Sequence, residues 1–295
     1  MRVLVFGGTG QLGKGMVDRL LRSDEIDDVR VAVENTIEFC IAPRSIDVSD
    51  LHSLSWLVTD FQPDWIINAA AYTQVDAAEL NPHQSISTNS SGAANVALCA
   101  QRVGAKLVYF STESVFDGNS MAPYFEGDAR NPLSVYSISK HAGEDLTREI
   151  CEDSFILRTS WLYGDSNVAN FPGRLLAKLS LSEGPVPVVT DLVGNPTPVE
   201  LLVDATFALM QSPPEVGTYH VCTSGSATKN EWAKAIARSR GFTPDRIVSA
   251  KSSDFATAAR RSKHVILSCE KFIATGLLEL PPWDVYYHAT KATPH

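Results

Sequence analysis

The sequence lacks the marks of a membrane, metal-binding or disulfide-stabilised protein. Its five cysteines among 295 residues lie far apart without a CxxC spacing, so neither a zinc site nor a disulfide framework is indicated. No apolar run approaches the ~18 residues of a membrane-spanning helix, and the apolar run after Arg2 is too short for a signal peptide. We therefore expect reduced thiols, no membrane contact and a cytoplasmic location.

Basic charge is also scarce. The chain has 25 Lys and Arg against 34 Asp and Glu, a formal net charge of -9. Because proteins bind nucleic acids largely through clustered Lys and Arg, we expect no nucleic-acid partner. Hydrophobic residues make up 44% of the chain, which is enough for one large domain or for a domain with an additional lobe.

A buried strand pattern, a glycine-rich turn and an amphipathic helix open the chain. Residues 3–6 form the apolar run, and the turn GGTGQLG follows at once over residues 7–13. Such glycines let the backbone approach a pyrophosphate, whose charge the helix N-terminus stabilises. The residues expected to hold a dinucleotide there are Gly7, Thr9, Gly10, Gln11, Leu12 and Gly13.

Charged residues after the second predicted strand affect the choice of dinucleotide. Residues 29–34 form this strand and end in Glu34, about 20 residues after the glycines, where an NAD ribose hydroxyl would bind. Arg44 follows closely and could instead hold the 2′-phosphate of NADP. Both NADH and NADPH therefore stay open. Asp47, just before the next predicted helix, is a further candidate cofactor contact.

Later strands are expected to end at the same edge of the sheet. A buried strand is predicted within residues 63–71, and another over residues 106–110, shortly before Thr112. The small residues at the end of the first that suit close approach of a cofactor are Ala69, Ala70 and Ala71. Because ligands of open parallel sheets bind outside the carboxyl ends of the strands, Thr112 should face the same space as the glycine turn.

A tyrosine and a lysine lie four residues apart on one predicted helix. Tyr136 and Lys140 would leave the same helix face, and a nearby ammonium favours a phenolate and lowers the pKa of the phenol. Tyr136 could then exchange a proton with a substrate oxygen. The same spacing recurs at Tyr287 and Lys291, where no neighbouring motif supplies a cofactor, so the spacing needs its context to indicate catalysis.

The regular alternation of strands and helices loosens after the sixth predicted strand, residues 154–159. A strand at residues 218–221 and a helix at residues 228–240 are expected to complete a smaller lobe. The predicted fold is α/β, a Rossmann-type doubly wound parallel sheet with a smaller, discontinuous substrate-binding lobe. The expected dinucleotide-binding domain covers residues 1–165 and about 190–220, and the expected lobe covers about 166–189 and 221–295.

Six segments spread over nearly the whole chain strengthen this interpretation. They are VFGGTGQLG at 5–13, NAAAYTQVD at 68–76, STESVFDG at 111–118, VYSISKHAGE at 135–144, RTSWLY at 158–163 and GNPT at 194–197. Together they resemble extended short-chain dehydrogenases/reductases and, within them, the dTDP-4-dehydrorhamnose reductases. The resemblance implies reduction of the 4-keto group of a dTDP-linked 6-deoxyhexose with NADPH or NADH.

The resemblance also implies roles for single residues. Thr112, Tyr136 and Lys140 fall on the catalytic triad of the family, with the tyrosine as proton donor, the lysine on the nicotinamide ribose and the threonine at the carbonyl oxygen. The candidate substrate contacts are Val75, Glu113, Ser114, Trp161, Asn170 and Arg261. For Trp161, Asn170 and Arg261, the alternatives without a role in substrate binding are a core aromatic residue, a helix cap and a surface charge.

Departures from the family pattern leave several points open. Ser114 replaces an aromatic residue that helps hold the sugar, so the exact hexose is uncertain, and Ala77 replaces a lysine. Some members bind magnesium at a dimer interface through an acid where this chain has Gly15, so we expect no metal and leave a homodimer only as a possible assembly. The alternatives to a reductase are a nucleotide-sugar epimerase or dehydratase and a catalytically silent regulatory subunit.

Overall fold

The computed structural model describes residues 1–33, 44–164 and 170–287. Its centre is a parallel sheet of seven strands in the spatial order β3, β2, β1, β4, β5, β6 and β11. The strands are β1 (Arg2–Phe6), β2 (Asp28–Val33), β3 (Arg44–Ser45), β4 (Trp65–Asn68), β5 (Lys106–Thr112), β6 (Ser154–Thr159) and β11 (Gly217–His220). The first six have the Rossmann order, which confirms the predicted fold class.

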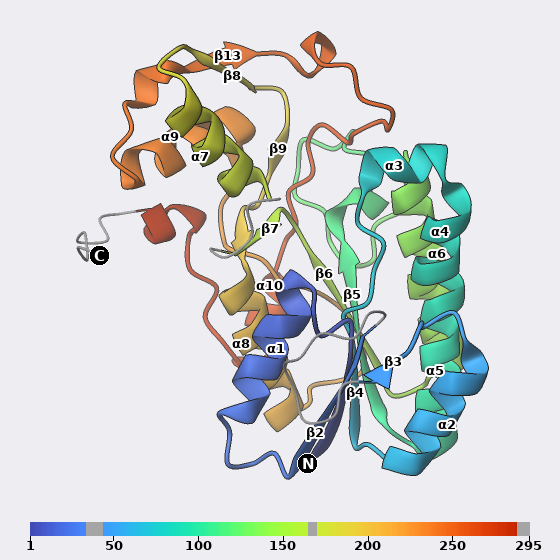
Figure 1. Cartoon of the computed structure of the whole chain (residues 1–295). Helices are drawn as coiled ribbons and strands as arrows, with labels where there is room; N and C mark the ends of the chain where they lie inside the picture. Colours follow the sequence, from blue (N-terminus) through green and yellow to red (C-terminus); the bar gives the residue numbers. More distant parts are fainter. Residues whose placement is uncertain (34–43, 165–169, 288–295) are drawn as a thin grey trace.

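Helices cover both faces of the sheet (Figure 1). The helical elements around it are α1 (Gln11–Leu21), α2 (Leu51–Phe61), α3 (Val75–Leu80), α4 (Pro82–Ile86), a π-helical turn (Ser87–Ser91), α5 (Gly92–Val103), a 3-10 turn (Glu113–Val115), α6 (Val135–Ile150), α8 (Val199–Gln211) and α10 (Glu270–Ile273). Helices α1 and α8 pack on one face, and α2, α5 and α6 pack on the other. Residues 82–103 are thus divided into α4, the π-helical turn and α5.

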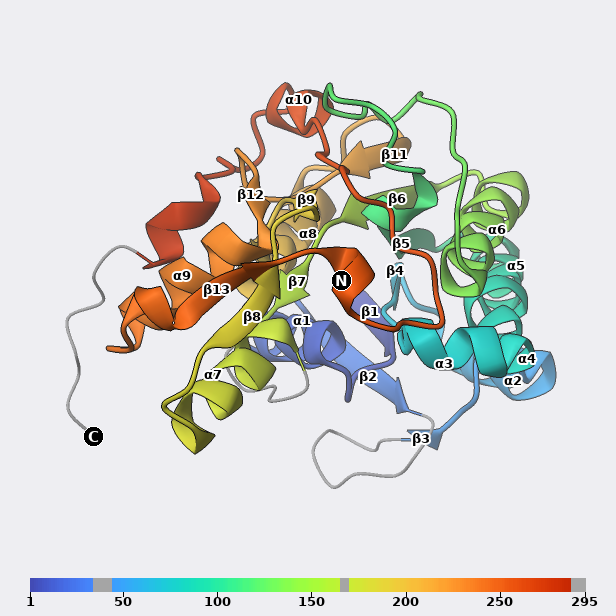
Figure 2. The ribbon, with the colours of Figure 1, turned by 90° about the horizontal axis from the view of Figure 1, so that it is seen from above.

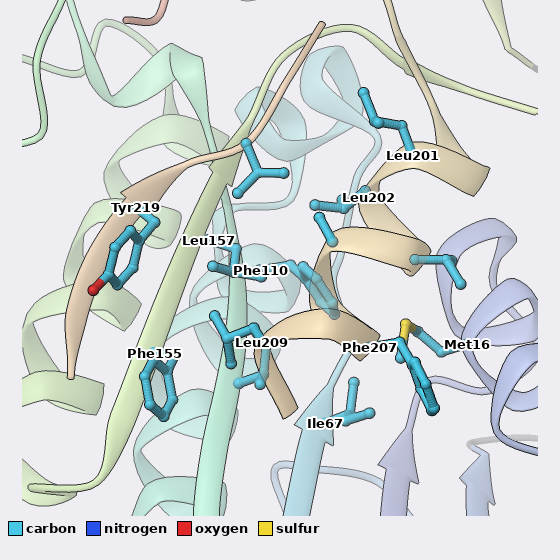
Figure 3. Packing of buried hydrophobic residues seen from close by; sticks show 14 of the residues in the cluster. Met16, Ile67, Phe110, Phe155, Leu157, Leu201, Leu202, Phe207, Leu209 and Tyr219 are labelled. Atoms are coloured by element: carbon cyan, nitrogen blue, oxygen red, sulfur yellow. The ribbon is translucent and has the colours of Figure 1, made fainter. Parts of the chain in front are cut away.

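The larger hydrophobic core lies between the sheet and α8. Figure 3 shows Phe110 and Leu157, from β5 and β6, beside Leu202 and Leu209 of α8, with Met16 of α1 close by. All five side chains are at least nine-tenths buried. This two-sided burial explains why the central strands are nearly continuous apolar runs in the sequence.

A second core forms a smaller layer beyond the carboxyl ends of the strands. Its elements are β7 (Leu162–Tyr163), α7 (Phe171–Leu181), β8 (Val186–Val189), β9 (Val193–Gly194), β10 (Thr197–Pro198), β12 (Ala227–Thr228), α9 (Lys229–Ser239), β13 (Ile247–Ala250) and 3-10 turns at Pro244–Arg246, Ser252–Asp254 and Trp283–Tyr287. Trp232 of α9 is 1% exposed and anchors this core, which we call the lobe core. The predicted domain boundaries stay a prediction.

One strand was expected in the wrong place. The strand at residues 218–221 does not complete the lobe, because β11 pairs in parallel with β6 as the edge strand of the central sheet. The chain after β13 then returns above the strand ends toward α3 (Figure 2). Asp76 of α3 accepts hydrogen bonds there from the Ala259 amide and from Arg261, so this segment is tied to the sheet side of the molecule.

Within the described ranges, no helix is both long and apolar enough to span a membrane. The same residues contain no group of three or more His, Cys, Asp or Glu side chains arranged to hold a metal ion.

A buried ion pair fastens α6 to the sheet. Glu144 and Arg158 are 0% and 1% exposed, and the guanidinium donates from Nε and Nη2 to the two carboxylate oxygens at 2.8 and 2.7 Å. Arg130 adds a third contact to Glu144 at 3.1 Å. Removing one member of such a pair leaves the other charged and buried, which is strongly destabilising.

Replacing Glu144 with Ala is therefore expected to lower the free energy of unfolding by about 3–5 kcal/mol. The neighbouring Asp145 is a matched control, because its carboxylate is partly exposed and contacts Arg130 and Arg148 at the surface. Asp145→Ala should cost less than about 1 kcal/mol. Urea unfolding of both variants measures the difference, and equal losses would contradict the structural role of the buried pair.

Candidate active site

The glycine turn and the ends of three neighbouring strands meet at one edge of the sheet. In the register of the sheet, Phe6 of β1 pairs with Asn68 of β4, which pairs with Tyr109 of β5. The turn that begins at Gly7 and the alanines that begin at Ala69 therefore leave the sheet at the same level. Thr112 lies at the end of β5, so the residues predicted to bind a cofactor and a substrate share this edge.

The glycine turn fits a phosphate-bearing ligand. Gly7 has a φ of 75°, and a Cβ there would lie 2.5 Å from the amide nitrogen of Ala70. Gly10 is exposed at the N-cap of α1 without a side-chain cap, so amides at the first turn of the helix are left for an anion. Around it, Thr9 is exposed and Gln11 is half-buried.

The structure describes the other predicted cofactor contacts except Glu34 and the side chain of Arg44. Leu12 is half-buried on α1 and Gly13 is buried, while Ala69 and Ala70 are half-buried and Ala71 is exposed. The predicted ribose contact Glu34 lies outside the described residues, and so does the side chain of Arg44. Asp47 is exposed, and its carboxylate accepts a hydrogen bond from the Ser49 amide at 2.8 Å.

The three predicted catalytic residues converge on one point. Helix α6 begins after Ser134, whose hydroxyl accepts from the Ser137 amide, and its first turn carries Tyr136. Thr112 lies close enough to the phenol of Tyr136 to act on its pKa. One turn further along, Lys140 is 3% exposed, and its ammonium donates to the Phe110 carbonyl at 2.6 Å. The i, i+4 spacing therefore places both side chains against the end of β5.

The expectation that Lys140 lowers the pKa of the Tyr136 phenol is wrong for this geometry. Burial of the phenol, followed by the negative charge of Glu113, raises the pKa of Tyr136, whereas its hydrogen bond with Thr112 acts in the opposite direction. Burial also lowers the pKa of Lys140 to about 7, and the charge of Glu144 only partly offsets this. A half-neutral amine cannot favour the phenolate strongly, so Tyr136 is held as a protonated acid.

Two predicted substrate contacts adjoin Thr112 directly. The Thr112 hydroxyl donates to a carboxylate oxygen of Glu113 at 2.9 Å and also lies 2.9 Å from the Ser114 hydroxyl. Burial raises the pKa of Glu113, which the hydrogen bond with Thr112 and the charge of Lys229 partly offset. Val75 is half-buried at the start of α3. Polar groups therefore surround Thr112 where a sugar oxygen would lie.

Asn170 and Arg261 are engaged elsewhere in the chain. The Asn170 side-chain oxygen caps α7 by accepting from the Gly173 amide at 2.9 Å, and its amide group donates to the Gly164 carbonyl at 2.8 Å. The Arg261 guanidinium donates to Asp76 at 2.7 Å. These contacts correspond to the alternatives of a helix cap and a surface charge. The Asn170 amide group also lies 3.3 Å from the side-chain oxygen of Gln11, next to the glycine turn. Sugar or diphosphate contacts of the two residues stay predictions.

Trp161 belongs to the aromatic part of the lobe core. Its ring stacks on Trp232 with centroids 5.6 Å apart, and its backbone has a φ of 42°. The ammonium of Lys229 lies 3.5 Å from the centre of the Trp161 ring. The sequence analysis did not identify Lys229, because a lysine at the start of a predicted helix is indistinguishable from a solvated charge.

Asn89 is a second residue that the sequence analysis missed. It is 0% exposed in the π-helical turn, and its side-chain amide donates to the Tyr72 carbonyl at 3.0 Å while its oxygen accepts from the Tyr72 amide at 2.9 Å. The same amide group donates to the Ser139 hydroxyl on α6 at 3.0 Å. Asn89 thus joins the segment after β4 to the helix of Tyr136. No sequence motif indicated this contact.

Comparison with known proteins decides the family. Residues 1–291 match the family model described as RmlD substrate binding domain. The chain belongs to this family. A dTDP-4-dehydrorhamnose reductase of Escherichia coli strain K12 is 34% identical to it over 97% of this chain and 95% of the relative.

Solved structures of family members have the same fold. A dTDP-4-dehydrorhamnose reductase of Bacillus anthracis in complex with NADP has a TM-score of 0.87 and 33% identity, covering 97% of this chain and 96% of that one. A dTDP-4-dehydrorhamnose reductase of Clostridium acetobutylicum has a TM-score of 0.88 and 27% identity with the same coverage. The family resemblance stated from the sequence is confirmed.

The lowered pKa of Lys140 predicts a pH-dependent contribution to stability. The amine titrates near pH 7 in the folded chain and near 10.5 in the unfolded chain, so between these values the unfolded chain binds one proton more. Stability from this group therefore rises with pH. Wild type should gain stability relative to Lys140→Met between pH 7 and pH 10, measured by urea unfolding. A difference that does not change with pH would contradict the assigned pKa.

Proposed function

We propose that this chain is an NAD(P)H-dependent reductase that converts the 4-keto group of a dTDP-linked 6-deoxyhexose to an alcohol. The observation that carries the proposal is the convergence of Thr112, Tyr136 and Lys140 beside the glycine turn. Relatives named dTDP-4-dehydrorhamnose reductase, aligned over nearly the whole chain, support the substrate class. This function was expected from the sequence resemblance.

Residues of the sheet edge would hold the cofactor. The exposed first turn of α1 would bind the pyrophosphate, and the small residues from Ala69 to Ala71 leave room for the dinucleotide beside it. When bound, the reduced nicotinamide dinucleotide supplies a hydride to the carbonyl carbon. The Bacillus anthracis relative was solved with NADP, which supports NADPH without excluding NADH.

The proton for the product hydroxyl comes from Tyr136. Because burial and Glu113 raise the pKa of its phenol, this group is protonated at neutral pH and can donate as the carbonyl oxygen gains electron density. The Thr112 hydroxyl lies beside the phenol, and its O–H, which Glu113 accepts in the free chain, would turn to the carbonyl oxygen when the substrate is bound. Lys140 retains N–H groups beyond the one donated to the Phe110 carbonyl, and these would hold the nicotinamide ribose.

Glu113 and Ser114 are the proposed sugar contacts that the geometry supports best. Both lie within hydrogen-bond distance of Thr112, so their remaining polar atoms are next to the reacting carbon. Val75 and Trp161 would border the sugar as apolar surfaces. A homodimer and a cytoplasmic location stay predictions.

Replacing Tyr136 with Phe is expected to lower kcat by about 10²- to 10⁴-fold, because the phenol is the proton donor. NADPH binding should be retained. The measurement is oxidation of NADPH and of NADH at 340 nm with a panel of dTDP-4-keto-6-deoxyhexoses. Redox-neutral turnover by wild type would instead indicate an epimerase or dehydratase, and no turnover would indicate a regulatory subunit.

Tyr219→Phe is the matched control for this prediction. Its phenol donates to the Glu215 carbonyl near β11, at the edge of the sheet. The control should keep near-normal kcat. If Tyr136→Phe also kept near-normal turnover, the assigned proton donor would be wrong.

A further inference from the structure

Lys229 lies among aromatic rings at the start of α9. Its ammonium is 3.5 Å from the ring centre of Trp161, 4.5 Å from that of Trp232 and 4.7 Å from that of Phe171. The side chain is half-buried. The negative faces of the rings favour a positive charge. Burial nevertheless lowers the pKa of the Lys229 amine well below its usual value, and the charge of Glu113 only partly offsets this.

Two structural features around Lys229 are energetically unfavourable. Trp161 adopts a left-handed backbone, rare for a bulky residue, and a Cβ on Gly194 would lie 2.7 Å from its ring, so a glycine is needed there. Lys229 also places its charge in the first turn of α9, where the helix dipole disfavours a cation. Strained backbone and unfavourable charge together are typical of functional sites rather than of solvated surfaces.

The ammonium has N–H groups to give to a ligand. Among the described residues, its only close partners are the three rings, and no oxygen of that part of the chain lies within hydrogen-bond or ion-pair distance. A half-buried amine without an acceptor is unfavourable, and an oxygen of a bound ligand would satisfy its N–H groups.

Glu113 shows which part of a substrate would supply that oxygen. Its carboxylate and the Lys229 ammonium influence each other electrostatically, but they are too far apart for an ion pair. Glu113 accepts from Thr112, which lies next to Tyr136. Because Lys229 acts on a carboxylate that adjoins Thr112, it belongs to the sugar end of the proposed substrate site rather than to its nucleotide end.

We propose that Lys229 is a specificity-determining residue that donates hydrogen bonds to oxygens of the hexose ring, opposite Glu113. The acceptors are hydroxyl oxygens near the reacting carbon, so the pair selects the configuration of the sugar. This role deepens the proposed function and rests on it. It gives the chain a sugar contact that does not depend on the aromatic residue missing at Ser114.

The test compares Lys229→Met with wild type in two binding measurements. Methionine keeps the length and the contact with the rings but donates no hydrogen bond. Calorimetry with NADP⁺ present should show that dTDP-rhamnose binds about 10- to 100-fold more weakly to the variant, the range for a lost charge-assisted hydrogen bond. Binding of dTDP alone should change by less than about twofold, because that ligand has no hexose.

Lys106→Met is the matched control, because Lys106 also lies near an aromatic ring, 5.7 Å from the centre of Trp65, but at the opposite end of β5. It should bind both ligands as wild type does. Equal weakening of dTDP and dTDP-rhamnose in Lys229→Met would make Lys229 a diphosphate contact and overturn the inference, as would no weakening of either. If wild type oxidised no NADPH with any substrate, the proposed function would fail while this binding comparison still decided the role of Lys229.

Discussion

A hydrogen bond of 2.6 Å from the Lys140 ammonium to the Phe110 carbonyl joins the helix of the candidate active site to the central sheet. Because Phe110 lies two residues before the end of β5, this bond brings the start of α6 to the edge where that strand ends. The buried pair of Glu144 and Arg158 fastens the next turn of the same helix to β6. The position of Tyr136 beside Thr112 depends on these two attachments.

Burial gives Tyr136 and Lys140 protonation states that differ from those suggested by their spacing in the sequence. Lys140 loses much of its charge at neutral pH, while Tyr136 keeps its proton. The pair therefore works as a fixed proton donor beside an amine that is only partly charged at neutral pH, rather than as a phenolate beside an ammonium. For a reduction, which ends with a proton on the substrate oxygen, a protonated tyrosine is the useful state.

The fold class, the family and the reductase chemistry could be predicted because they depend on local patterns. A glycine turn after an apolar run can be recognised from neighbouring residues, and so can a tyrosine four residues before a lysine when other motifs accompany it. The pairing of β11 with β6 could not be predicted, since the residues of a four-residue strand do not specify which strand lies beside it. Asn170 and Arg261 were expected at the substrate, and that role stays a prediction, because their side chains contact other groups of the chain in the free structure.

The sequence by itself determined the alternation of strands and helices, the glycine turn and the residue types available for catalysis, because each follows from neighbours along the chain. Only the tertiary structure decided how charges are desolvated and paired. Lys229 is an ordinary lysine in the sequence, yet folding places it against Trp161 and across from Glu113. Side chains that are far apart in the sequence acquire their chemistry from burial and from each other, and neither can be read from local order.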